Sequence, residues 1–279
     1  APTELVAVDG SIARSLLWSI WQAGDDNVRT HSTAVAAPAV AFGRHPVAAS
    51  LSAARYATVQ ECVHLVVSRG TMPVFIERLR SRLTGDLPGE AAQYRMAPAA
   101  RPRMDEALSV STQQRQSAVL LFLFPQQGEW RTILMKRTDG GGVHSGQVSI
   151  PGGQLEPGEN HAQAALREFQ EETGIDVNSS QLLGKLSELF IPPSNFLVRP
   201  FVAHANQRPQ FEPDPVEVEE LIELPISDLM NDLTVKRGTV RLSGGAWVQA
   251  PYFDVLGHTV WGATAMILSE FKEVLRDLR

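Results

Sequence analysis

Three glutamates stand close together in the second half of the chain, at a spacing that suits one patch of a helix. Glu168, Glu171 and Glu172 follow one another at i, i+3 and i+4, so we expect their carboxylates to converge. Like charges at this spacing destabilise a helix by about 0.2–0.5 kcal/mol per pair. A divalent cation would neutralise them, and oxygen ligands select hard ions, Mg²⁺ first and Mn²⁺ second. The cluster therefore predicts a metal site.

Arg167 is the only strong base beside these glutamates. No lysine lies between Asn160 and Ile175, whereas a solvated acidic face usually interleaves lysines to avoid the like-charge cost. Arg167 can reach Glu171 one helical turn further on and fix the orientation of its carboxylate. The alternative, an acidic surface helix without a metal, is disfavoured by this absence of lysine.

The glutamates require a helix, and the residues around them supply its start and its end. Asn160 can cap the first turn, and Gln163, three residues later, can complete a capping box. Gly174 can adopt the left-handed conformation that ends a helix. The sequence thus predicts a helix over residues 161–173 that packs an apolar face on a sheet. That face consists of Ala162, Ala165, Leu166 and Phe169.

A mixed sheet is predicted around this helix. Ala118–Phe124 is a continuous apolar run, and a turn at residues 126–129 joins it to a second strand at Arg131–Lys136 as a hairpin. Two more amphipathic helices are predicted, one over Pro73–Leu83 and one from near Gly262 to the last residues. Strands interleaved with helices indicate an α/β architecture in which helices cover the sheet. Further strands are predicted at Gln147–Ile150, Lys185–Phe190, Val198–His204, Glu219–Glu223 and Trp247–Phe253.

The 279 residues divide by composition into three parts. Residues 1–71 are rich in alanine and serine and carry no motif, although residues 12–23 have the pattern of a short helix. Residues 72–114 contain the first amphipathic helix and then a segment rich in Gly, Pro, Ala and Arg, interpreted as a linker or a wrapping segment. Residues 115–279 carry the strands and the glutamates. Met72 is a candidate for the natural start, which would make the first part an upstream extension of unknown role.

Charge and composition exclude several classes of protein. The net charge of −6 argues against a nonspecific nucleic-acid or membrane-surface binder, because such a protein needs a basic face. No apolar run approaches the ~20 residues of a membrane helix, and we expect no signal peptide at the N-terminus. The single cysteine, Cys62, forms no intrachain disulfide, which fits a cytoplasmic location. We interpret Cys62 as a semi-buried thiol rather than a catalytic partner of His64.

The segment from Gly153 to Ile175 resembles the signature of the Nudix hydrolase family. Every fixed position of that signature is filled, by Gly153, Glu159, Arg167, Glu168, Glu171, Glu172 and Gly174. The resemblance implies the family's α/β/α sandwich and its metal-dependent attack of water on a nucleoside diphosphate linked to another moiety. It implies that Glu168, Glu171 and Glu172 bind the metal, with Glu159 as a supporting ligand. The proton acceptor stays open between Glu168, Glu171 and a loop carboxylate, and Arg167 has an orienting role.

The residues before this signature resemble the coenzyme A diphosphatase branch of the family. Lys136 and Arg137 end a strand, and after a Gly-rich turn follows His-Ser-Gly-Gln-Val-Ser-Ile-Pro-Gly-Gly over residues 144–153. Ile150 replaces the usual Phe, and Gly141 stands where many members have Leu. The resemblance implies a set of substrate contacts, namely Lys136, Arg137, His144, Gln147, Gly152 and Gly153. The segments Ile191–Phe196 and Trp261–Ala265 are also similar to members of this branch.

The expected reaction is cleavage of coenzyme A or acyl-coenzyme A into 3′,5′-ADP and (acyl-)4′-phosphopantetheine. One alternative is a Nudix enzyme for nucleotide sugars, ADP-ribose, dinucleotides or nucleoside triphosphates. A second is a Nudix domain that only binds, although such modules typically lose signature glutamates and none is lost here. The expected partner is a small nucleotide of the coenzyme A type. We expect neither nucleic acid nor a membrane as a partner. A homodimer stays open as the assembly.

Overall fold

The main sheet of the described residues is mixed, as the sequence predicts. The computed structural model describes residues 72–99, 101–109, 111, 113–138, 146–241 and 246–278. The strand order is β3-β2-β1-β7-β5, with β4 also paired to β1, β6 to β7 and β8 to β2. Only β1 and β7 run parallel; the other described pairs are antiparallel. The strands are β1 (Arg115–Gln126), β2 (Glu129–Arg137), β3 (Val148–Ser149), β4 (Gly152–Gln154), β5 (Leu182–Lys185), β6 (Leu189–Ile191), β7 (Phe196–His204) and β8 (Val218–Pro225).

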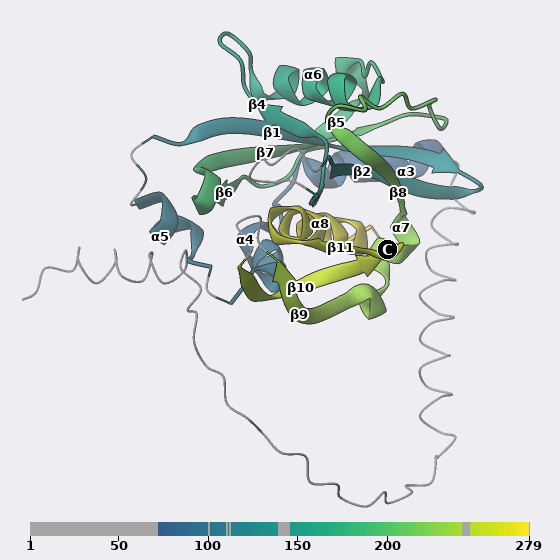
Figure 1. Ribbon diagram of the computed structural model, residues 1–279. Coiled ribbons are helices and arrows are strands. Elements are labelled where there is room, and N and C mark those ends of the chain that lie inside the picture. Colours follow the sequence, from purple (N-terminus) through teal and green to yellow (C-terminus); the bar gives the residue numbers. More distant parts are fainter. Residues whose placement is uncertain are drawn as a thin grey trace, which may run out of the picture.

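Helices cover both faces of this sheet, and a smaller sheet lies on the side of α8 that faces away from the main sheet (Figure 1). Helix α6 lies over one face, and α3 and α8 lie on the other. A three-stranded sheet with the order β11-β10-β9 packs beneath α8. These elements are α3 (Met72–Leu83), α6 (His161–Thr173), α8 (Gly262–Arg276), β9 (Val235–Arg241), β10 (Trp247–Val255) and β11 (His258–Trp261). The shorter helices are α4 (Gly89–Gln93), η1 (Tyr94–Met96), α5 (Met104–Ser109), η2 (Ser179–Gln181), η3 (Pro192–Ser194), α7 (Ile226–Met230) and η4 (Asp232–Thr234).

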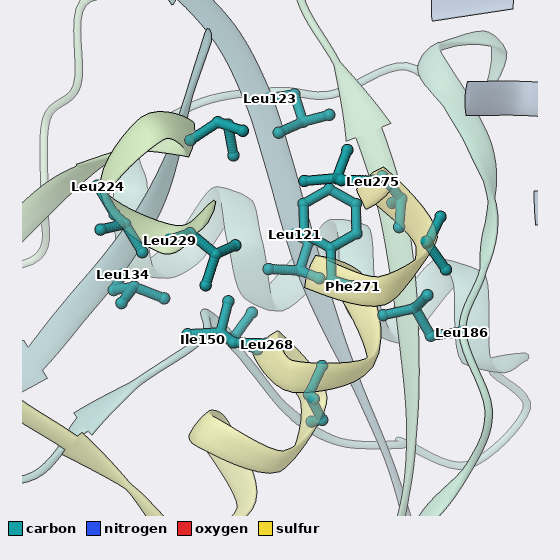
Figure 2. Close-up of a cluster of buried hydrophobic side chains, with 14 of the residues drawn as sticks. Leu121, Leu123, Leu134, Ile150, Leu186, Leu224, Leu229, Leu268, Phe271 and Leu275 are labelled. Carbon is teal, nitrogen blue, oxygen red and sulfur yellow. The ribbon is translucent and has the colours of Figure 1, made fainter. Parts of the chain in front are cut away.

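Hydrophobic side chains fill the space between these layers. Successive residues of β1 point to opposite faces, and both faces are covered, which explains why its apolar run is continuous. Phe122 packs against Phe169 of α6, with ring centroids 5.0 Å apart. The larger core lies on the other face, where fully buried Leu121 and Phe271 belong to one cluster (Figure 2). Strand β1, which carries β4 and the start of the glutamate segment, is therefore fixed from both sides.

The predicted hairpin and the three predicted helices in the described part of the chain are confirmed. Gln126 pairs with Glu129 across the β1–β2 turn. The two residues between them, Gln127 and Gly128, have φ of 53° and 78°, the positive values that a tight two-residue hairpin turn requires. Helix α6 has the predicted limits, residues 161–173, and α3 and α8 begin within a residue of the predicted positions.

Several predicted strands are wrong in their limits. The strand predicted over residues 185–190 is two strands, because the chain turns inward between them and the Ser187 N–H donates to the buried Glu270 carboxylate at 3.2 Å. The strand predicted over residues 147–150 is reduced to Val148–Ser149, and β4 follows separately. The sequence did not indicate β9 or β11. Of the two interpretations of residues 84–114, a linker or a wrapping segment, the structure favours the wrapping segment, since Ala92 and Gln93 of α4 are buried.

Some sequence predictions fall outside the described residues. These are the extension of residues 1–71, with its candidate helix and Cys62, and the Gly-rich turn with His144 in residues 139–145. Among the helices in the described ranges, none combines the length and the apolar character that crossing a membrane requires.

Candidate active site

Helix α6 has the ends that the sequence predicts. The Asn160 side chain accepts a hydrogen bond from the Gln163 N–H at 3.0 Å, and the Gln163 side chain accepts one from the Asn160 N–H at 2.9 Å. Gly174 ends the helix in the left-handed conformation, with φ of 74°. These local hydrogen bonds satisfy backbone groups that a helix end leaves open. The glutamates are consequently carried on a helix with fixed limits.

The buried face of α6 is rotated from the predicted one. Ala164, Ala165 and Phe169 are buried, whereas Ala162 is only half-buried. Glu172 lies on the same buried face, and its side chain is 2% exposed. Consecutive helix residues are about 100° apart, so Glu171 points outward and is 58% exposed. The expectation that all three glutamates share one outer patch is therefore wrong for Glu172.

Arg167 connects three of the predicted carboxylates. Its guanidinium binds Glu159 at 2.7 Å, Glu168 at 3.0 Å and Glu171 at 2.9 Å. The same guanidinium donates to the Gln154 carbonyl at 3.1 Å. The hydrogen bond between Glu159 and Arg167 is the main reason why the pKa of Glu159 is lowered and the pKa of Arg167 is raised. The predicted contact with Glu171 is confirmed, and Arg167 orients Glu159 and Glu168 as well.

Glu172 is held by a separate set of donors. One carboxylate oxygen accepts from Arg137 at 2.7 Å, and the other accepts from the Gly152 N–H at 2.8 Å. Burial raises the pKa of Glu172 to about 7, against the opposing effects of Arg137 and Gly152. Glu168 and Glu217 raise this pKa further by repulsion. The carboxylate is therefore anchored between β2 and β4, inside the protein.

The two glycines of β4 allow the backbone to approach its neighbours closely. A Cβ added to Gly153 would lie 2.3 Å from the Glu168 carboxylate carbon. A Cβ added to Gly152 would lie 2.3 Å from the Ala118 carbonyl oxygen. Burial raises the pKa of Glu168, although Arg167 acts in the opposite direction. A side chain at Gly152 would therefore require the backbone to shift, whereas a side chain at Gly153 would displace the Glu168 carboxylate, which rests directly on the β4 backbone.

The residues predicted to contact substrate are only partly brought together. Arg137 turns toward α6 at an irregularity in the β2–β8 pairing. Lys136 binds Glu219 at 2.5 Å. The Gln147 carbonyl accepts from the Arg137 N–H at 3.1 Å, which places Gln147 at the edge of this group. The segment after Trp261 reaches the same edge, where the Thr264 hydroxyl donates to the Val148 carbonyl at 3.1 Å.

Glu217 is a carboxylate of the site that the sequence interpretation missed. It ends the connection between β7 and β8, residues 205–217, and lies 3.6 Å from Nη1 of the Arg137 guanidinium. Asp214 shapes the approach, because its side chain accepts from the Val216 N–H and its carbonyl accepts from the Glu217 N–H. The sequence Asp-Pro-Val-Glu over residues 214–217 indicates a turn. That turn signal gave no indication of nearness to Arg137.

The chemistry of these side chains fits a hard divalent cation. The donors are carboxylate oxygens, which suit Mg²⁺ or Mn²⁺. Glu168 and Glu172 are desolvated and repel each other, and Glu217 adds to the repulsion, so the group carries negative charge that a cation would neutralise. Within the described ranges, no three acidic, His or Cys side chains stand close enough to enclose an ion. Arg167 and Arg137 bind the carboxylates in this arrangement.

Comparison with known sequences identifies the family of this chain. A model of the NUDIX domain matches residues 114–241. The uncharacterized Nudix hydrolase NudL of Pectobacterium atrosepticum is 32% identical over 175 residues, which cover 59% of this chain and 85% of that protein. A MutT/nudix family structure from Enterococcus faecalis aligns over 78% of this chain and 74% of its own, with 14% identity and a TM-score of 0.43. The chain belongs to the Nudix hydrolase family.

Two further relatives carry more specific names. Nudix hydrolase 15, mitochondrial, of Arabidopsis thaliana is 32% identical over 162 residues, covering 55% of this chain and 56% of that protein. The mitochondrial coenzyme A diphosphatase NUDT8 of Homo sapiens is 32% identical over 130 residues, covering 45% of this chain and 54% of that protein. The chain spans about half the length of the first curated relatives it matches. Because these relatives are named as mitochondrial, the cytoplasmic location stays a prediction.

Proposed function

We propose that this chain is a divalent-cation-dependent diphosphatase that hydrolyses coenzyme A or its acyl derivatives. The products would be 3′,5′-ADP and 4′-phosphopantetheine or its acyl form. The observation that carries the reaction class is the group of carboxylates that Arg167 and Arg137 hold against Gly152 and Gly153. Membership of the Nudix family supports the same class.

Glu168, Glu171 and Glu172 would hold the cation, with Glu159 in support. When bound, Mg²⁺ or Mn²⁺ neutralises diphosphate oxygens and lowers the pKa of the attacking water. The protein's own contribution is orientation, because Arg167 fixes three carboxylates and the Gly152 N–H fixes the fourth.

In the proposed reaction, the oxygen of water bonds to one phosphorus, and the bond from that phosphorus to the bridging oxygen breaks. The bridging oxygen leaves on the second phosphate group. A carboxylate of the site accepts the proton that the water loses. Glu168 and Glu171 are the candidates on α6.

The coenzyme A specificity is proposed from the residues around the end of β2 and from one relative. Arg137 ends β2 beside Glu172, where a guanidinium can meet phosphate oxygens, and Lys136 precedes it and binds Glu219. NUDT8, a relative at 32% identity, is named as a coenzyme A diphosphatase. His144 and Gly141, which belong to the motif of this branch, lie outside the described residues. The substrate is therefore proposed from the motif around residues 136–153 and from this relative.

A hydrolysis panel tests the proposal. Coenzyme A, acetyl-coenzyme A, ADP-ribose, NADH and ATP are incubated with the full-length chain and Mg²⁺ or Mn²⁺, and the products are separated by chromatography. We expect the highest kcat/KM for coenzyme A or acetyl-coenzyme A, with the 3′-phosphate retained on the adenosine product. A kcat/KM for ADP-ribose, NADH or ATP well above that for coenzyme A would overturn the substrate and leave the reaction class standing. Absence of turnover with all five would favour a binding module.

A further inference from the structure

Arg137 lies between two carboxylates, one buried and one exposed. Its Nη2 binds buried Glu172 at 2.7 Å, and its Nη1 lies 3.6 Å from Glu217. Glu172 is 2% exposed, whereas Glu217 is 54% exposed. The pair with Glu172 is short and sheltered from water, so it resists exchange with a dissolved anion. The contact with Glu217 is longer and open to solvent, so it is the one that an anion can displace.

Backbone hydrogen bonds hold Glu217 beside Arg137. The Glu217 carbonyl accepts from the Thr138 N–H at 3.0 Å, and the Val216 carbonyl accepts from the Thr138 hydroxyl at 2.8 Å. Earlier in the same connection, the Glu212 N–H donates to the Thr173 carbonyl at the end of α6, at 2.9 Å. The backbone position of Glu217 is thus independent of its own side chain, which can be changed without releasing the segment.

We propose that Glu217 competes with the anionic substrate for Arg137 and thereby sets the affinity of the site for phosphate groups. This inference rests on the proposed function, because it assigns Arg137 to a phosphate of the substrate. In the free protein Glu217 faces Nη1 of the guanidinium. A substrate phosphate displaces that carboxylate, while Glu172 stays bound to Nη2 and keeps the orientation of Arg137. Glu217 is on this account a positioning and affinity-determining residue that makes no contact with the reacting atoms.

Lys136, the other cation at the end of β2, has a different arrangement. Glu219 lies 2.5 Å from its ammonium group, so a carboxylate already binds it closely. The wider spacing at Arg137 is what makes competition by a weakly bound carboxylate specific to this residue.

The test uses the full-length chain and inorganic pyrophosphate as the probe. Calorimetric titration in EDTA compares the original protein with Glu217→Gln and with Glu212→Gln, which removes the same charge from the same connecting segment. Glu212 is exposed and hydrogen bonds through its side chain to Gln210 rather than to an arginine. We expect Glu217→Gln to lower the Kd for pyrophosphate by about 2–5-fold, the range of an exposed ion pair. The Glu212→Gln variant should leave the Kd unchanged.

A double-mutant cycle shows whether the gain acts through Arg137. In an Arg137→Lys background, which keeps a cation beside Glu172, adding Glu217→Gln should produce no comparable gain. With Mg²⁺ and coenzyme A, the Glu217→Gln variant should show a lower KM and a kcat within about twofold of the original. Thermal melts of each variant check that the fold is retained.

Several outcomes would overturn the inference. These are equal effects of Glu217→Gln and Glu212→Gln, a gain that survives Arg137→Lys, or no pyrophosphate binding even by Glu217→Gln. A fall in kcat of about 100-fold in Glu217→Gln would instead place Glu217 among the catalytic carboxylates. The pyrophosphate titration does not depend on which nucleotide is hydrolysed. If coenzyme A proved not to be the substrate, the titration result would still stand.

Discussion

Arg167 and Arg137 bind different carboxylates of the site, and these carboxylates differ in burial. Arg167 is about one-quarter exposed and binds glutamates that stay in contact with solvent or lie half-buried. Arg137 reaches the one glutamate of the group that is buried. A guanidinium presents several donors in a fixed plane, so it can orient more than one carboxylate at once. Each arginine therefore orients carboxylates that differ in their exposure to solvent.

Charge removal at Glu171 and Glu172 tests whether these residues serve the metal. Glu171→Gln and Glu172→Gln each remove one charge with almost no change of shape. We expect kcat to fall about 100-fold or more in each, a loss of about 2.7 kcal/mol in transition-state stabilisation. The measurement is turnover of coenzyme A at saturating Mg²⁺. Near-original kcat in both variants would show that α6 does not carry the metal.

The same two substitutions should differ in their effect on stability. Glu171 is 58% exposed, so its contact with Arg167 contributes little, and we expect a change within about 0.5 kcal/mol. Glu172 is buried, and a Gln amide can accept from only one of its two donors, Arg137 or the Gly152 N–H. The other donor is left without an acceptor, so the free energy of unfolding should fall by about 1–3 kcal/mol, and the removal of a buried charge offsets part of this loss. Urea unfolding of the metal-free proteins measures both values. Equal stability of the two variants would mean that Glu172 is not enclosed as described.

Gly153→Ala tests the contact between β4 and Glu168. The added methyl group would lie 2.3 Å from the carboxylate carbon of Glu168, so the side chain must move away from its present position. We expect kcat to fall about tenfold or more with only a modest change in melting temperature. Gly85→Ala is the control, because its added methyl group would find its nearest neighbour at 3.7 Å, far from the site in sequence. An active Gly153→Ala variant would show that the position of Glu168 is not critical.

At the scale of elements, α6 could be predicted because the signals that set its limits are local. Asn160 and Gln163 cap each other, and Gly174 terminates the helix, without help from distant residues. The rotation of the helix against the sheet is not local. Whether Glu172 or Glu171 turns inward depends on how Ala164 and Phe169 fit against β1, and this contact brings together residues far apart in the sequence.

Strands β9 and β4, which the sequence did not indicate, lack a periodic pattern of hydrophobic residues. Strand β9 is mostly exposed and contains Lys236, Arg237 and Arg241, so it has little hydrophobic alternation. Strand β4 consists of Gly-Gly-Gln, in which close packing replaces side-chain burial. Glu217 was missed because it lies at the end of an irregular segment, residues 205–217. Such segments show no pattern of contacts in the sequence.

Buried Glu270 of α8 joins the wrapping segment to the core. It is fully buried, and it accepts from the Gly89 N–H, the Gln93 side chain and the Ser187 N–H. Glu270→Ala would leave these donors without their acceptor in the interior. We expect the free energy of unfolding to fall by about 3 kcal/mol, measured by urea denaturation. Glu77→Ala, at an exposed position of α3, should change it by less than about 0.5 kcal/mol, and similar losses in both would contradict this role.

At the scale of the whole molecule, both cores and the carboxylate group are built from residues 72–278. Helix α3 is part of this unit, because Phe75 stacks on Trp130 of β2 at 5.3 Å and Leu79 is fully buried. Strand β5 also depends on it, since Gly184 lies against Leu83 closely enough to leave no room for a Cβ. Helix α3 therefore belongs to the structural core, although it precedes the residues that match the NUDIX domain.

This arrangement predicts how the protein responds to shortening from its N-terminus. A chain that begins at Met72 keeps α3, both cores and every described residue of the site, so we expect it to stay soluble and retain most of the diphosphatase activity. A chain that begins at Thr84 loses α3 and exposes the apolar residues of β2 and β5 that α3 covers, so it should aggregate. The measurements are kcat/KM with coenzyme A and size-exclusion chromatography of both chains beside the full-length protein. An insoluble or inactive chain from Met72, next to an active full-length protein, would show that residues 1–71 cover apolar surface or build a dimer contact.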